Sequence, residues 1–97
     1  MATRDEILTL LGTLKTDLSS RYKVRRIGIF GSYARSEAVP GSDVDILVDF
    51  NPRADFFDLI DLSLFLEERI GKKMDLATPR ALRPEVRERV LRDVVYV

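Results

Sequence analysis

The stretch Gly28–Phe50, with the sequence GIFGSYARSEAVPGSDVDILVDF, has the composition of two buried strands joined by a loop. Gly31 and Ser32 end the first strand, and two aspartates, Asp43 and Asp45, open the second. Acidic residues are poor strand formers, so folding alone does not explain two aspartates at the start of a strand. We therefore expect this stretch to carry the function as well as to set the fold.

The chain has 97 residues, which is the size of one domain, so we predict a single domain over residues 1–97. Its 16 basic and 16 acidic side chains give a net charge of zero, so no bulk field favours nucleic acid or an anionic membrane. We therefore expect no direct nucleic-acid binding, and any nucleotide must bind at a local site. No apolar run reaches membrane-spanning length and the first residues lack the layout of a signal peptide, which favours a cytoplasmic protein.

The chain contains no cysteine and no histidine. This composition excludes disulfides, thiol nucleophiles, histidine bases and the usual zinc sites. The groups left for chemistry are carboxylates, hydroxyls, backbone amides, arginine and lysine. Oxygen ligands of this kind suit a hard cation such as magnesium.

Hydrophobic periodicity and cap signals predict an α+β fold, with about four helices flanking a small mixed sheet of three strands. The expected helices are Arg4–Ser19, Ser32–Glu37, Phe56–Ile70 and a last one that begins near Pro84 and carries Val86, Val90 and Val94. The expected strands are Val24–Phe30, a strand from Asp43 to the break at Asn51-Pro52, and Lys73–Ala77. The first connection is too short for a parallel crossover, whereas residues 51–72 are enough for one. Phe56 and Phe57 are expected in the core.

Asp43 and Asp45 lie two positions apart, so in a strand their carboxylates point to the same side, about 7 Å apart at the backbone. Two carboxylates held this close repel each other unless a counter-charge is present, and a divalent cation supplies one. A solvated outer face of an edge strand is the plainer interpretation of the pair. Asp75 is a further acid inside a short apolar strand. If that strand lies beside the first pair, three carboxylates meet as in sites for two magnesium ions about 4 Å apart.

Gly31 and Ser32 offer a second kind of chemistry. Glycine lets the backbone approach a phosphate closely, and the first turn of the following helix presents free N–H groups. The Ser32 hydroxyl adds a donor, and Arg35 could reach phosphate oxygens or brace the loop by pairing with a carboxylate. An ordinary turn would explain a lone Gly-Ser pair. Beside a pair of metal-binding aspartates, however, it indicates a site for a nucleoside triphosphate.

The run Gly31-Ser32-Tyr33-Ala34-Arg35, followed by Ser42-Asp43-Val44-Asp45, resembles the signature of the DNA polymerase β-type nucleotidyltransferases. Nearly the whole chain resembles the smallest members of that superfamily, the minimal nucleotidyltransferases that act as MNT antitoxins of HEPN-domain toxins. Many relatives carry glycine directly after the arginine, where this chain has Ser36. That difference could stiffen the loop, but it removes no ligand.

The resemblance implies a role for each of these positions. Gly31 and Ser32 would bind the triphosphate of ATP, the nucleotide donor, and we predict Arg35 and Ser42 as further phosphate-binding residues beside them. By the same resemblance, two Mg²⁺ ions would be bound by Asp43, Asp45 and Asp75, and Asp75 would also act as the catalytic base. The implied reaction is transfer of an adenylyl group to a hydroxyl of the partner toxin.

Three functions stay open. The first is a magnesium-dependent nucleotidyltransferase that modifies a partner protein, since the predicted elements leave no second domain to hold an acceptor. The second is an antitoxin with weak or no catalysis that neutralises its partner by binding. The third is a nucleotidyltransferase acting on a small molecule. A homo-oligomer is compatible with each of them.

The late part of the chain is rich in arginine. Helix-surface ion pairs, Glu85 with Arg89 and Glu88 with Arg92, would account for much of this charge. A face that binds RNA or the toxin is the alternative. Tyr33, inside the phosphate loop, is expected to pack rather than to stack on a base.

Overall fold

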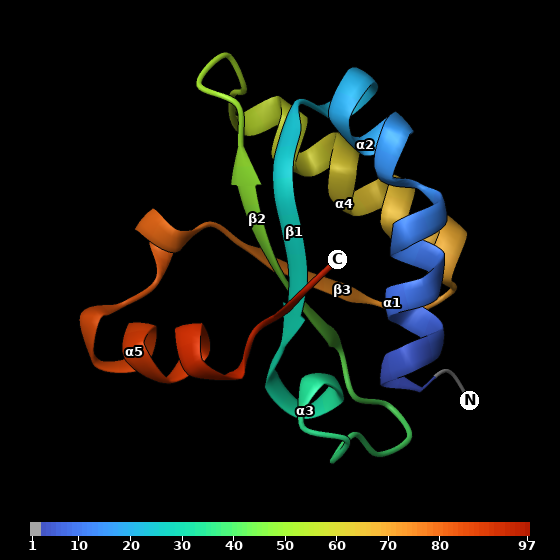
Figure 1. Cartoon of the computed structure of the whole chain (residues 1–97), viewed down its shortest axis with the longest axis vertical. Coiled ribbons are helices and arrows are strands. Elements are labelled where there is room, and N and C mark those ends of the chain that lie inside the picture. Colours follow the sequence, from blue (N-terminus) through green and yellow to red (C-terminus); the bar gives the residue numbers. More distant parts are fainter. Residues whose placement is uncertain (1–2) are drawn as a thin grey trace.

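The computed structural model describes residues 3–97, so the first two residues of the predicted domain lie outside the described part. It contains a four-stranded sheet with the order β3-β2-β1-β4 (Figure 1). The strands are β1 (Val24–Phe30), β2 (Val44–Phe50), β3 (Met74–Ala77) and β4 (Val95–Tyr96). β1 is antiparallel to both β2 and β4, whereas β2 and β3 are parallel. The mixed sheet and both predicted strand directions are therefore confirmed.

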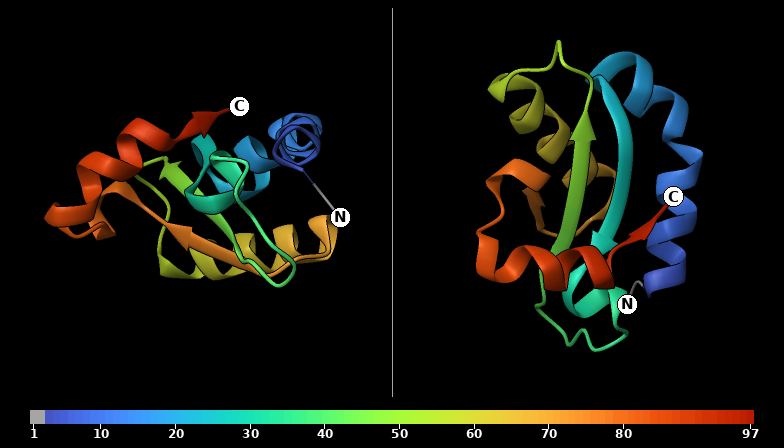
Figure 2. Two further views of the ribbon diagram at one scale, coloured as in Figure 1. Left: turned by 90° about the horizontal axis from the view of Figure 1, so that it is seen from below. Right: turned by 60° about the vertical axis from the view of Figure 1, so that its left-hand side comes forward.

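Five α-helices accompany the sheet within the described residues. They are α1 (Arg4–Thr13), α2 (Lys15–Tyr22), α3 (Gly31–Ala34), α4 (Phe56–Ile70) and α5 (Pro84–Asp93), and a 3₁₀ turn covers Pro79–Ala81. α4 lies on one side of the sheet and α5 on the other (Figure 2). None of the helices described here is long and apolar enough to cross a membrane.

The core forms between α1, α2, α4 and the sheet face that these helices cover. Its fully buried side chains are contributed by both layers, among them Ile7, Leu11, Leu18, Ile29, Ile46, Leu62 and Leu66. α4 begins and ends as the sequence predicts. Asp55 and Asp58 form a capping box at its start, and Gly71 ends it with a φ of 76°. α4 is the crossover between β2 and β3, and a connection of this length lets the two strands run parallel.

The predicted helix Arg4–Ser19 is divided in two at Leu14. Gly12 is a weak helix former, and the Thr13 hydroxyl donates a hydrogen bond to the Leu10 carbonyl oxygen at 2.7 Å, which competes with the regular helix pattern. The second part runs on to Tyr22. The prediction of one helix was therefore wrong in two respects, the break at Leu14 and the end at Tyr22. The buried side chains nevertheless continue from the first helix into the second.

The predicted last helix was too long, and the sheet has four strands rather than three. α5 ends at Asp93, and Val95–Tyr96 pairs with Gly28 and Ile29 of β1. Gly28 permits this pairing because a Cβ at that position would collide with the Val95 carbonyl oxygen. A glycine inside a strand is a sign of such close approach.

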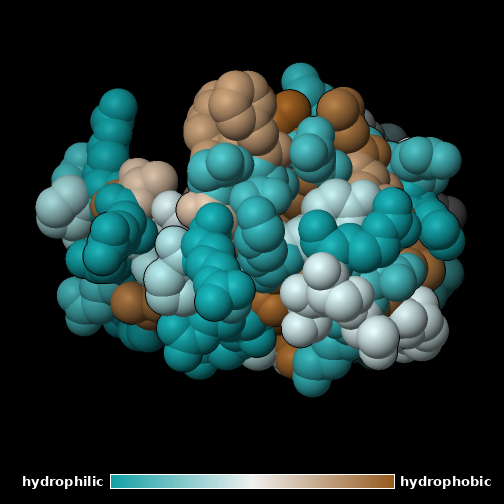
Figure 3. All heavy atoms as spheres, turned by 90° about the horizontal axis from the view of Figure 1, so that it is seen from above, coloured by the Kyte–Doolittle hydropathy of each residue, from teal (hydrophilic) through white to brown (hydrophobic). Residues whose placement is uncertain are grey.

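Two further predictions fail at the surface. Phe56 and Phe57 are 69% and 72% exposed, because the buried face of α4 is set by Leu62 and Leu66 and the two phenylalanines lie out of phase with it. With Ile60 and Leu64 they form an exposed apolar stripe on α4. Figure 3, a view onto the end of the molecule where β1 begins, shows hydrophobic side chains among hydrophilic ones at the surface.

The ion pairs predicted on α5 also do not form within residues 3–97, where the arginine side chains of this helix extend into solvent. Exposed pairs of this kind contribute little, so solvation competes with them.

The close approach of β4 to Gly28 can be tested by substitution. We expect Gly28→Ala to lower the free energy of unfolding by about 1–3 kcal/mol, because the added methyl group forces β4 away from β1. Urea denaturation followed by circular dichroism measures this change. Gly12→Ala is the matched control, since its Cβ would meet only Val97 Cγ1 at 3.6 Å in a helix, and we expect it to stabilise the fold by about 0.5–1 kcal/mol. Equal effects of the two substitutions would contradict this account of Gly28.

Candidate active site

The loop after β1 and the acidic start of β2 lie at the same end of the sheet. β1 ends at Phe30, whose register partner in β2 is Asp45, and α3 begins at the next residue. On its other side, Asp45 is the register partner of Asp75 in β3. Asp45 therefore stands between the Gly31 loop and the second acidic strand. The central position of β2 in the sheet produces this arrangement.

The carboxyl groups of Asp45 and Asp75 lie close together. The pKa of Asp45 is raised to about 6, first by burial and then by the negative charges of Asp75 and Asp43. A hydrogen bond to Asp75, which favours a protonated Asp45, raises this pKa further, and the charge of Arg35 opposes the shift. Asp45 is thus a partly buried acid whose negative charge lacks sufficient compensation.

The charge of Asp43 also raises the pKa of Asp45, but Asp43 itself lies outside the pair formed by Asp45 and Asp75. It is exposed, precedes β2, and is the residue just before Val44, whose N–H donates to the Lys73 carbonyl oxygen. Across residues 3–97, no three acidic side chains are grouped closely enough to form a metal site as they stand. The structure therefore brings Asp45 and Asp75 together, and it leaves Asp43 adjacent to them. The donors are carboxylate oxygens, which fit a hard divalent cation, and such a cation would remove the repulsion that raises the Asp45 pKa.

Gly31 lies directly against the Asp45 carboxylate. Its φ is 71°, and a Cβ at this position would overlap Asp45 Oδ2. Glycine is therefore required here for two reasons, the left-handed backbone and the contact with the acid. The approach to a phosphate that we predicted for Gly31 is a separate role, which this contact leaves possible. Ser32, in the first turn of α3, is partly exposed beside it.

Arg35 contacts carboxylates, which is one of the two roles considered for it. Its Nη1 donates to Asp93 Oδ2 of α5 at 3.0 Å, and its Nε donates to Glu37 at 3.3 Å. These hydrogen bonds raise the pKa of Arg35, with the Asp93 bond first among the causes. Arg35 thus ties the loop at α3 to α5. Asp93 was missed by sequence reasoning, and its separation of 58 residues from Arg35 left no signal to find it.

Ser42 and Ser36 shape the loop between α3 and β2. The Ser42 hydroxyl accepts a hydrogen bond from the Val39 N–H at 3.0 Å, so it stabilises the turn before Asp43. Ser36 has a φ of 59°, in the left-handed region that favours glycine. Ser36 therefore occupies a backbone conformation that glycine adopts without strain.

Tyr33 packs in the core, as predicted. It is 2% exposed, and its hydroxyl is buried without a hydrogen-bond partner among the described residues. Its ring lies 6.0 Å from the Lys72 ammonium. Tyr33 therefore anchors α3 to the core, and its ring is not available to stack on a nucleotide base.

Comparison with known proteins gives consistent matches over nearly the whole chain. The family model described as a nucleotidyltransferase domain matches residues 11–97. The protein adenylyltransferase MntA of Thermococcus cleftensis is 44% identical over 97 residues, covering 100% of this chain and 98% of that protein.

Solved structures agree in fold. A candidate minimal nucleotidyltransferase superposes with a TM-score of 0.76 at 36% identity, covering 92% of this chain and 93% of the other. A chain from the structure of a tri-AMPylated HEPN toxin of Shewanella oneidensis in complex with MNT antitoxin superposes with a TM-score of 0.68 at 20% identity, covering 97% and 71% of the two chains. At that identity the second match bears on the fold alone.

The raised pKa of Asp45 predicts how stability depends on pH. Because the carboxyl pKa is about 6 in the folded chain and 3.8 ordinarily, the folded state binds the proton more tightly, so this group's contribution is present at low pH and is lost as pH rises through 6. We expect the unfolding free energy of wild type, minus that of Asp45→Asn, to be about 1–3 kcal/mol lower at pH 7.5 than at pH 4, allowing for solvent screening. Urea denaturation across this range, without divalent ions, measures it. A difference that does not vary with pH would show that Asp45 titrates normally.

The left-handed backbone at Ser36 predicts a gain from glycine. We expect Ser36→Gly to stabilise the chain by about 0.5–1 kcal/mol, since relief of the left-handed strain exceeds the added freedom of the unfolded chain. Thermal denaturation measures the gain. Ser20→Gly, in the helix α2, is the control and should destabilise the chain. A loss of stability in both variants would mean that Ser36 is not strained.

Proposed function

This chain belongs to the nucleotidyltransferase domain family, and we propose that it transfers an adenylyl group from ATP to a hydroxyl group on a partner protein. The observation that carries the proposal is the placement of Asp45 between Asp75 and the Gly31 loop. This arrangement sets paired carboxylates beside a loop whose backbone can approach phosphate. The name of the relative from Thermococcus cleftensis supports adenylyl as the transferred group and a protein as its acceptor.

The exposure of the acids favours a macromolecular acceptor. Asp43 and Asp75 are both exposed, so a hydroxyl carried on the surface of another protein can reach them. The related complex of MNT antitoxin with a modified HEPN toxin supports a HEPN-domain toxin as the partner. With such a partner this chain is the antitoxin, and the adenylyl group that it adds abolishes the activity of the toxin.

Each residue of the site would have a separate role in the reaction. Backbone N–H groups at Gly31 and Ser32 would hold the triphosphate, and the Ser32 hydroxyl would add a donor. Asp43, Asp45 and Asp75 would hold two magnesium ions, which when bound neutralise the charge that develops on the phosphate oxygens. Asp75 would accept the proton of the acceptor hydroxyl. The acceptor oxygen then bonds to the α-phosphorus of ATP, the bond from that phosphorus to the β-phosphate breaks, and pyrophosphate leaves.

Neutralisation by binding alone is the second candidate. The observation that favours it is the exposed apolar stripe of α4, since exposed patches of large apolar residues often mark protein interfaces. In this case the partner would lose its activity without gaining mass.

Substitution of Asp75 separates the two functions. We expect Asp75→Asn to bind ATP and the partner but to transfer no adenylyl group, because the group that accepts the proton is lost. The experiment incubates the chain with the HEPN-domain toxin proposed as its partner, ATP and Mg²⁺, and it follows the intact mass of that toxin and its toxicity in cells. Asp49→Asn is the matched control, since Asp49 lies on the same strand as Asp45, four residues away.

Each outcome bears on the proposal. Transfer by wild type and by Asp49→Asn, but not by Asp75→Asn, supports it. Neutralisation of the partner by wild type with no gain in mass favours the binding mechanism instead. Full transfer by Asp75→Asn would refute the assignment of the base.

A further inference from the structure

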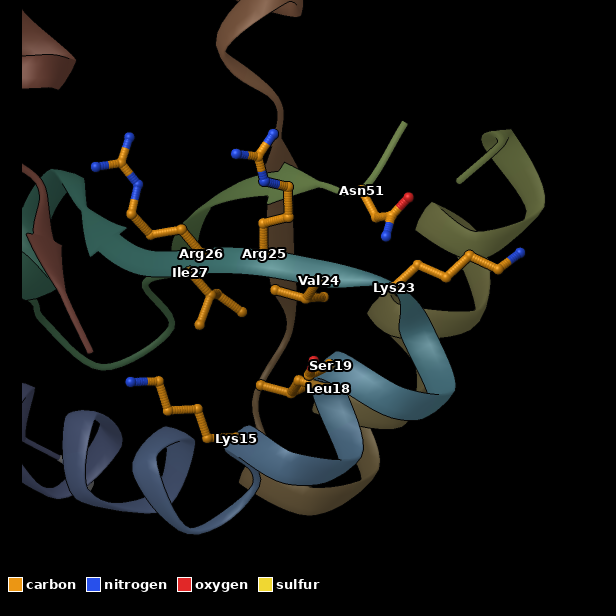
Figure 4. A pocket seen from close by; sticks show the side chains of 9 residues that line it. All are labelled: Lys15, Leu18, Ser19, Lys23, Val24, Arg25, Arg26, Ile27 and Asn51. Carbon is orange, nitrogen blue, oxygen red and sulfur yellow. The ribbon is translucent and has the colours of Figure 1, made fainter. Parts of the chain in front are cut away.

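A cleft with a volume of about 360 Å³ lies beside the first half of β1, at the end of the strand opposite Gly31 (Figure 4). The residues of its wall that matter here are Lys15, Leu18, Val24, Arg25, Arg26 and Ile27. Along β1, the cleft residues Val24 to Ile27 lie about 20 to 10 Å from Phe30, the register partner of Asp45. The proposed reaction makes no use of it.

The charged groups that line the cleft are all cationic. Lys15, Lys23, Arg25 and Arg26 contribute to it, and no carboxylate does. Lys23 already pairs with Asp58 at 3.2 Å, and the Arg26 guanidinium lies 4.0 Å from the centre of the Tyr96 ring. Within residues 3–97, Lys15 and Arg25 form no ion pair. The cleft therefore offers the unpaired positive charges of Lys15 and Arg25, together with the charge of Arg26, which lies over the Tyr96 ring.

The cleft also borders an open edge of the sheet. β4 pairs only with Gly28 and Ile29, so within the described residues no strand covers Val24–Arg26 on that side. A bulge at Arg25 interrupts the pairing of β1 with β2 at the same point. Open sheet edges accept extended segments through backbone hydrogen bonds.

The side chains of the cleft lie on two sides of β1. Arg25 and Arg26 extend to one side of the strand, and Val24 and Ile27 extend to the other, toward α2 with Leu18 (Figure 4). An extended segment added at this edge would present alternate side chains to the two sides. Acidic residues would therefore face the arginines, and apolar residues would face Val24, Ile27 and Leu18.

We propose that this cleft binds an acidic, extended segment of the protein substrate, in which acidic and apolar residues alternate. The proposal rests on the proposed function for the identity of that substrate as the acceptor protein. The distance from the acidic site makes the segment an anchor for the acceptor, separate from the reacting hydroxyl. A short cleft in a chain with no net charge fits a few carboxylates better than a polynucleotide, whose binding relies on an extended run of cations.

The test measures peptide binding by fluorescence anisotropy, without ATP. The probe is a fluorescein-labelled peptide of four glutamates alternating with three valines. We expect saturable binding to wild type that is weakened about tenfold in the double variant Arg25→Gln, Arg26→Gln at low ionic strength. The matched control, Arg87→Gln with Arg89→Gln on exposed α5, should bind as wild type does. A peptide with proline in place of valine should bind more weakly, because proline lacks the N–H needed at a sheet edge.

Three results would overturn the proposal. They are no binding of the peptide, equal weakening in the cleft and control variants, or tighter cleft-dependent binding of an eight-residue uridine oligonucleotide than of the peptide. Failure of the proposed function is seen separately, as absence of adenylyl transfer by a wild-type chain that still binds the peptide. If both stand, the cleft variant raises KM for the partner protein and leaves kcat unchanged.

Discussion

The structure depends on the close contact of three groups, the Asp45 carboxylate, the Asp75 carboxylate beside it and the backbone of Gly31. The antiparallel pairing of β1 with β2 brings Gly31 to Asp45, and the parallel crossover through α4 brings Asp75 to its other side. Burial and like charge then raise the Asp45 pKa to about 6, so the contact is unfavourable for the charged acid alone. Such repulsion is what we expect of a site that binds a compensating charge.

The periodicity of the sequence and its turn signals predicted most of what places this site. Alternation over residues 43–48 predicted β2, although Asp43 precedes the strand, and Asp55 and Gly71 predicted both ends of α4. Connection lengths predicted which strands are antiparallel and which are parallel. These features succeeded because each is a local pattern with a direct backbone consequence. Asp75 was an unusual acid in a short apolar strand, but its place beside Asp45 was only a condition of the sequence prediction, and the structure supplies that pairing.

What the sequence did not predict depends on contacts between distant residues. The strand β4 exists because Gly28 leaves room for it, and Arg35 finds Asp93 only after α5 has folded back. Phe56 and Phe57 are exposed because the phase of α4 is set by its later residues. A hydrophobic residue near a helix start carries no local mark of burial, so its position could be known only from the packed structure.

The central claim is that the acids at this end of the sheet are arranged for a divalent cation and a triphosphate. Titration of the Asp45 side-chain carboxyl by carbon-13 NMR tests it most directly, first without divalent ions and then with Mg²⁺ and a non-hydrolysable ATP analogue. The account predicts a pKa of about 6 without the ions and a clear fall when both ligands are added. An Asp45 pKa that is near its usual value and is unchanged by Mg²⁺ and nucleotide would contradict it.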